Sequence, residues 1–75
     1  MEQVRCVIAG KDEALNEKLF WASVRLGVGR HVVIGESDAI KAIEEEFISD
    51  VEFLPAGSSP PENSIIFNGN ITQQN

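Results

Sequence analysis

The sequence predicts one small α/β domain with a mainly parallel sheet of three or four strands. Three short apolar runs, Val4–Ala9, His31–Ile34 and Val51–Leu54, have the length and branched residues of buried strands. Two helical patterns separate these runs. Strands that alternate with helices of this length imply right-handed crossovers and a parallel sheet.

The first strand–helix unit has clear boundaries. Val4–Ala9 stops at Gly10, and Asp12 stands where an N-cap belongs. The predicted inner face of the helix has residues at helical spacing: Leu15, Leu19, Ala22 and Leu26. Gly27 and Gly29 are expected to end this helix, because glycine tolerates the left-handed cap conformation.

The second unit repeats this arrangement. His31–Ile34 is stopped by Gly35, and Ser37 can cap the next helix. The predicted inner face of that helix is made of Ala39, Ile40, Ile43 and Phe47. Val51–Leu54 is the third strand.

The last third of the chain has a different character. Pro55–Ser64 contains all three prolines, so we expect a loop. Ser64–Phe67 is a candidate fourth strand, and Asn68-Gly69 is a turn signal. We therefore assign residues 4–67 to a single domain and residues 68–75 to a polar tail or the start of a linker.

Composition excludes several classes of partner. The net charge of −6 and the pI of about 4.5 argue against binding to nucleic acid or to anionic membranes. No apolar stretch is long enough to span a bilayer, and the first residues lack the layout of a signal peptide. Cys6 is the only cysteine and is expected in the core. We expect a cytoplasmic protein without a metal site or a cofactor.

Residues 4–55 follow the order strand, helix, strand, helix, strand, with the turn Gly35-Glu36-Ser37 and a third strand that opens at Asp50-Val51. In this spacing the stretch resembles the first half of a response-regulator receiver domain. The resemblance implies a flavodoxin-like sheet with the strand order 2-1-3. It also implies a bacterial signalling context.

The resemblance further implies a site that has lost its chemistry. The family holds Mg²⁺ with an acidic pair after the first strand and accepts a phosphoryl group on an aspartate after the third. Here the pair falls on Gly10 and Lys11, and the acceptor falls on Pro55. The chain is thus expected to be a truncated pseudo-receiver without phosphorelay and without enzymatic activity.

Two features predict a contact surface. In the order 2-1-3 the third strand, which includes Phe53, lies at an open edge that Ser64–Phe67 or a second copy must cover. The outer side of the first helix is expected to carry Phe20, Trp21 and Val24, and large apolar residues on such a face suggest an interface. The alternative is that a loop or the tail of the same chain covers them.

We therefore expect a non-catalytic regulatory or scaffolding module that associates with itself, as a homodimer, or with another cytoplasmic protein. Two alternatives remain. The first is a small-ligand or nucleotide-binding regulatory domain with its site around Gly10, Lys11, Gly35 and Pro55. The second is a fragment of a pilus-assembly ATPase or of a polysaccharide-export ATPase. The run Leu54-Pro55-Ala56-Gly57, followed by Pro60-Pro61, resembles a short stretch of the polysaccharide-export ATPases.

Overall fold

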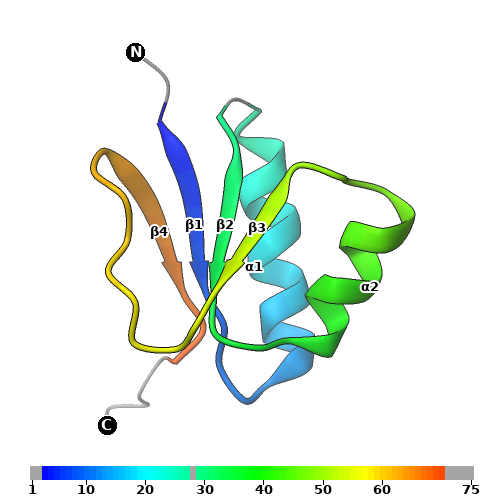
Figure 1. Cartoon of the computed structure of the whole chain (residues 1–75). Coiled ribbons are helices and arrows are strands. Elements are labelled where there is room, and N and C mark those ends of the chain that lie inside the picture. The colour runs from blue at the N-terminus through cyan, green and yellow to red at the C-terminus, as the bar shows by residue number, and fades with distance from the viewer. Residues whose placement is uncertain (1–2, 28, 71–75) are drawn as a thin grey trace, which may run out of the picture.

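The computed structural model describes residues 3–27 and 29–70, and it shows a four-stranded sheet with both helices on one face (Figure 1). In chain order the elements are β1 (Val4–Ile8), α1 (Glu13–Arg25), β2 (His31–Ile34), α2 (Asp38–Glu46), β3 (Val51–Leu54) and β4 (Ser64–Asn68). All six lie where the sequence predicted a strand or a helix. The predicted α/β class is thereby confirmed.

All four strands are parallel, and their order is β3-β2-β1-β4. The predicted order 2-1-3 is therefore wrong. β3 pairs with β2 and not with β1, and β4 takes the place beside β1 that the receiver-like order reserves for the third strand. The edges of the sheet are accordingly β3 and β4.

This order agrees with the distribution of apolar side chains. In β2 the residues Val32, Val33 and Ile34 are all buried, so this strand is covered on both faces. β3 carries the exposed Glu52, and β4 carries Ile66, which is 50% exposed. Strands buried on both faces belong in the middle of a sheet, whereas the order 2-1-3 would have placed β2 at an edge.

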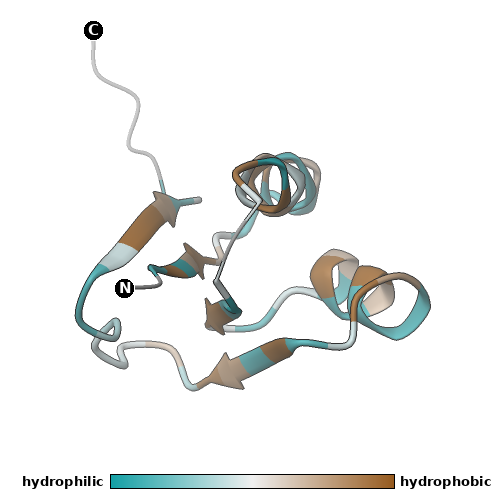
Figure 2. Ribbon diagram, turned by 90° about the horizontal axis from the view of Figure 1, so that it is seen from above, coloured by the Kyte–Doolittle hydropathy of each residue, from teal (hydrophilic) through white to brown (hydrophobic). Residues whose placement is uncertain are grey.

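Both helices lie on the same face of the sheet because both crossovers step in the same direction, from β1 to β2 and from β2 to β3 (Figure 2). The main core fills the space between the sheet and this helical layer. Its buried members are Val7, Phe20, Val33, Ile40 and Ile43.

Residues 55–63, nine in number, connect β3 at one edge to β4 at the other. This segment is too short for a helical crossover, yet β4 is parallel to β1. The diagonal path needs about 22 Å, and nine extended residues reach about 30 Å. The loop passes over the face opposite the helices (Figure 2), where Cys6 and Val32 are fully buried as a second apolar cluster.

The two predicted N-caps and the predicted end of α1 are confirmed. The carboxylate of Asp12 accepts a hydrogen bond from the Leu15 N–H, and the Ser37 hydroxyl accepts one from the Ile40 N–H. Gly27 follows the C-cap of α1 with φ of 92°. Asn68, the first residue of the predicted tail 68–75, belongs to β4, and residues 71–75 lie outside the described part of the chain.

Candidate functional site

The carboxyl ends of the strands form the end of the sheet at which α/β proteins bind ligands. Ligands enter where the chain leaves neighbouring strands in opposite directions. In this fold that position lies between β1 and β4. After β1 the chain crosses to β2, which lies on the side of β1 away from β4. Gly10 follows β1 there, and Gly69 follows β4.

The backbone of the protein itself closes this crevice. A Cβ atom on Gly10 would lie 2.2 Å from the carbonyl oxygen of Gly69. A Cβ on Gly69 would lie 2.7 Å from Oδ1 of Asn16. Both glycines are therefore required by close packing, and the space in which a ligand would sit is filled.

Asn16, which is fully buried, joins three elements at this end of the sheet. Its carboxamide accepts a hydrogen bond from the Gly10 N–H at 2.8 Å and donates one to the Gly10 carbonyl, also at 2.8 Å. The same Nδ2 lies 3.4 Å from the Ser37 hydroxyl at the start of α2. Asn16 thus holds the end of β1, the first turns of α1 and the N-cap of α2 together.

Carboxylates of the chain occupy both helix N-termini, which are the usual anion sites of such folds. Asp12 caps α1. At α2, Glu13 Oε1 accepts hydrogen bonds from the Ser37 hydroxyl at 2.6 Å and from the Ala39 N–H at 3.2 Å. These bonds, that of Ser37 foremost, lower the pKa of Glu13 below its ordinary value of 4.5. A phosphate would have to displace a carboxylate that is already in place.

A second polar cluster lies at the amino end of the sheet. The guanidinium of the buried Arg5 donates to the carbonyl oxygens of Ser23 at 3.2 Å and Leu26 at 2.7 Å, and so caps the C-terminus of α1. The ring of His31 is tilted by 46° against that of Phe20, with centroids 5.2 Å apart, and its buried Nε2 has no hydrogen-bond partner among the described residues. Burial first, and the charge of Arg5 second, lower the pKa of His31. This cluster serves packing and capping.

The three positions that correspond to the receiver site do not come together. Gly10 is packed against Gly69, and Lys11 is exposed. Pro55 follows β3, and β2 separates β3 from β1, so about two strand spacings, close to 10 Å, lie between the two strand ends. The order β3-β2-β1-β4 therefore separates Pro55 from Gly10 and Lys11.

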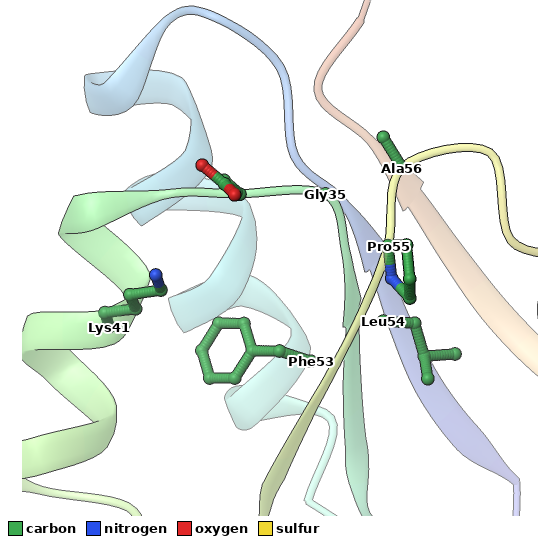
Figure 3. A pocket seen from close by; sticks show the side chains of 7 residues that line it. Gly35, Lys41, Phe53, Leu54, Pro55 and Ala56 are labelled. Atoms are coloured by element: carbon green, nitrogen blue, oxygen red, sulfur yellow. The ribbon is translucent and has the colours of Figure 1, made fainter.

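A shallow hollow of about 570 Å³ lies at the ends of β2 and β3. Its lining includes Gly35, Glu36, Pro55 and the side chains of Lys41 and Phe53, which reach into the gap between α2 and β3 (Figure 3). The charged groups of this hollow are Lys41 and Glu36, and the rest of its lining is mostly apolar. These groups do not form a recognisable catalytic arrangement. Across residues 3–27 and 29–70, no three His, Cys, Asp or Glu side chains lie close enough to hold a metal ion.

The surface with the most exposed aromatic side chain is a trough between α1 and α2. Phe47, at the C-cap of α2, is 68% exposed. Its ring lies edge-on to Trp21 of α1, with centroids 6.0 Å apart and an interplanar angle of 63°. The trough is lined by Glu17, Ala39, Ala42, Ile43, Glu46 and Phe47. An apolar floor thus lies between a carboxylate of α1 and a carboxylate of α2.

The predicted facing of α1 is wrong in part. Phe20, expected on the outer side, is fully buried, and Val24 is half-buried against the core, whereas Leu26, expected inside, is 50% exposed. The buried line of the helix is Asn16, Phe20 and Ser23. Two of these three residues are polar, so apolar periodicity could not identify this face.

Of the four residues predicted for an interface, Trp21 lies beside the trough, and Phe53 reaches into the hollow beside α2. Both are half-buried and pack against the main core. Phe47 was expected on the inner face of the second helix and is instead exposed, because α2 ends at Glu46 and Phe47 leaves the helical path. No signal in the sequence marked Phe47 as a surface residue.

Comparisons with known proteins found no matching family model, no matching curated protein and no matching solved structure. Within the described residues, no helix has both the length and the apolar character needed to cross a bilayer.

Proposed function

We propose that this chain is a non-catalytic protein-interaction module of the cytoplasm, whose contact surface is the trough between α1 and α2. The single observation that carries the proposal is Phe47, which is 68% exposed and rests against Trp21. Aromatic side chains supply much of the binding energy at protein interfaces. An exposed phenylalanine in contact with a half-buried tryptophan can therefore serve as the main contact for apolar side chains of a partner.

The charges around the trough indicate the chemistry of the partner. Glu17 lines it from α1 and Glu46 from α2, and its lining contains no cationic side chain. The chain as a whole has a net charge of −6. The partner would therefore present apolar side chains flanked by Lys or Arg, as one face of a basic amphipathic helix does.

The likeness to receivers remains part of the proposal on the spacing of its strands and helices alone. A role in regulation or scaffolding without phosphorylation agrees with Pro55 after β3 and with Gly10-Lys11 after β1. The observed order β3-β2-β1-β4 gives this likeness no support. Derivation from a pilus-assembly or polysaccharide-export ATPase likewise rests on sequence resemblance.

Ligand or nucleotide binding is the second candidate, with the hollow at Gly35 and Pro55 as its site. It is less favoured because Glu13 and Asp12 occupy the helix N-termini that would hold phosphate groups. Thermal denaturation with ATP, inorganic phosphate and Mg²⁺ separates the two functions. A rise of several degrees in Tm with ATP would contradict a contact-only role, since a ligand of the native state must stabilise it.

Trp21 is the only tryptophan of the chain, and its ring contacts Phe47, so its fluorescence reports on this end of the trough. The probe is a synthetic amphipathic helix of Leu and Lys, compared with a Leu/Glu helix of the same length. We expect a change in emission with the Leu/Lys helix alone. Phe47→Ala should weaken binding about tenfold, which corresponds to about 1.4 kcal/mol.

The matched charge variants are Glu17→Gln with Glu46→Gln, at the trough, and Glu52→Gln with Glu62→Gln, away from it. The first pair should weaken binding, and the second pair should leave it nearly unchanged. Equal losses of binding affinity in both pairs would mean that net charge alone attracts the Leu/Lys helix. This result would contradict the proposal.

A further inference from the structure

The outer edge of β4 is a second surface, on the side of the sheet away from β3. Gly69 donates its N–H to the Ile8 carbonyl at 2.7 Å, so the backbone groups of Gly69 and, by alternation, of Phe67 and Ile65 face β1. The backbone groups of Ser64, Ile66 and Asn68 therefore face outward. Among residues 3–27 and 29–70, no strand pairs with them.

Nothing in the sequence of this strand discourages pairing. Exposed edge strands are usually protected by a charge, a proline or a bulge. Residues 63–70, NSIIFNGN, contain neither a charged residue nor a proline. β4 also has five residues, which is a usual strand length, and it pairs along its whole length with β1.

The side chains of β4 add an apolar contact to the backbone groups. Phe67 points to the helical layer and packs against the main core. Ile66 points to the opposite face and is 50% exposed. An added strand would cover this isoleucine while it pairs with the backbone.

Charge decides which strand fits. Two copies of a chain with a net charge of −6 repel each other at most contacts. At the β4 edge the facing segments carry no charge, so repulsion is weakest there. Two-fold pairing would place Ile66 of one copy opposite Ile66 of the other, as a hydrogen-bonded pair with both side chains on the same face.

We propose that β4 pairs antiparallel with β4 of a second copy, so that the two sheets join into one continuous sheet of eight strands. This extends the contact function to a surface separate from the trough. It leaves the helical layers of both copies free to bind a partner. The dimer is held by backbone hydrogen bonds and by the Ile66 pair.

The test measures molar mass by light scattering and sedimentation over a range of protein concentrations. We expect a mass that approaches twice the 8.2 kDa of one chain. Ile66→Pro removes the outward N–H and no bond to β1, so it should give a folded monomer. Ile66→Lys should do the same through charge, and Ile66→Val, which keeps the strand and its apolar side chain, should stay dimeric.

Amide hydrogen exchange adds a residue-level readout. Protection of the Ile66 and Asn68 amides should increase with protein concentration, whereas the Phe67 amide, which faces β1, should be protected at every concentration. Circular dichroism and Trp21 emission identify a variant that fails to fold.

A wild-type monomer at every concentration would overturn this inference and leave the trough proposal standing. A dimer that persists in both Ile66→Pro and Ile66→Lys, or that dissociates on Phe47→Ala instead, would also overturn it, because the two copies would then meet elsewhere. Loss of Leu/Lys-helix binding in Phe47→Ala with the dimer intact would show that the two surfaces work separately.

Discussion

The two edges of the sheet are built differently. β3 has four residues, carries the exposed Glu52 and is followed directly by Pro55. β4 has five residues, carries no charge and exposes Ile66. Both are parallel edge strands of one sheet, yet only β3 has the features that discourage a further strand.

Pro55 gains a new explanation from this comparison. The Gly35 N–H donates to the Leu54 carbonyl, so the backbone of Leu54 faces β2 and the position after it faces outward. A proline at that position costs no hydrogen bond within the sheet, and it removes an N–H that a further strand could use. Pro55 stands where the receiver resemblance would place a phosphate acceptor. It also leaves the end of the β3 edge without an N–H with which a further strand could pair.

The attachment of the two strands also differs. β3 joins β2 through a regular ladder, from His31 paired with Val51 to Ile34 paired with Leu54. β4 joins β1 through a similar ladder and, beyond it, through the tight approach of Gly10 to Gly69 beneath Asn16. We therefore expect the β4 side of the sheet to be more sensitive to small changes in volume.

Among these variants, Gly10→Ala should cause the largest loss of stability. Its Cβ would lie 2.2 Å from a backbone oxygen, which cannot move as the end of a side chain can. We expect a loss of about 3 kcal/mol in the free energy of unfolding, measured by urea denaturation.

The control for this change is Gly57→Ala, in the loop that follows β3. This position has φ of 89° and no atom within 4 Å of an added Cβ, so only backbone strain of about 1 kcal/mol is expected. Equal losses in the two variants would show that the Gly10–Gly69 approach has no special importance.

Asn16→Ala should have the second largest effect. The change leaves the half-buried N–H and carbonyl of Gly10 without the partners that the carboxamide supplies at 2.8 Å. We expect a loss of about 1–3 kcal/mol, together with faster amide exchange at Gly10 and Gly69. Asn68→Ala, at an exposed position on β4, serves as the matched control and should lie within about 0.5 kcal/mol of wild type.

Opening the β3 edge should change association more than stability. Pro55→Thr restores an outward N–H, and Glu52→Thr removes the charge of the strand. Both residues are exposed, so together they should shift the free energy of unfolding by no more than about 1 kcal/mol. In an Ile66→Pro background the double variant should nevertheless gain self-association, seen as a rise in molar mass with concentration. A strictly monomeric result would mean that Glu52 and Pro55 do not protect this edge.

Lowering the pH should have the smallest effect on the free energy of unfolding, and the loss should occur in two steps. The pKa values of His31 and Glu13 are lowered in the folded protein from their ordinary values of 6.5 and 4.5. A group whose pKa is lower in the folded state contributes stability above its unfolded value, and this contribution is lost as the pH falls through the folded value.

The urea midpoint should therefore be highest above pH 6.5, decline below it and decline again below pH 4.5. Glu13→Gln should flatten the second step and spare the first. A midpoint that rises as the pH falls from 6.5 would contradict a lowered pKa of His31 in the folded protein.

Much of the local structure was predictable because it depends on residues close in sequence. Asp12 and Ser37 are N-caps as expected, and Gly27 ends α1, since these roles need only a side-chain oxygen or a permissive backbone a few residues from the helix end. The buried state of Cys6 was also predictable from its place in an apolar strand. These predictions required no knowledge of which strands pair.

The candidate surfaces were less predictable for a physical reason. Phe20 shares the buried face of α1 with Asn16 and Ser23. The hydrogen bonds of these two polar residues are satisfied inside the protein, whereas a hydropathy pattern counts both as outward residues. Phe47 is exposed because α2 ends one residue before it. The trough therefore depends on how two helices meet.

Within the described residues, the sequence determines the six elements and their N-caps, and it also gives an acidic composition and a proline directly after β3. Only the tertiary structure decides the order β3-β2-β1-β4, and with it the closed edge at Pro55 and the open edge at Ile66. Strand order is a choice between pairings that form nearly the same backbone hydrogen bonds. It is settled by the direction of each crossover and by which strands are covered on both faces, and these are properties of the assembled domain.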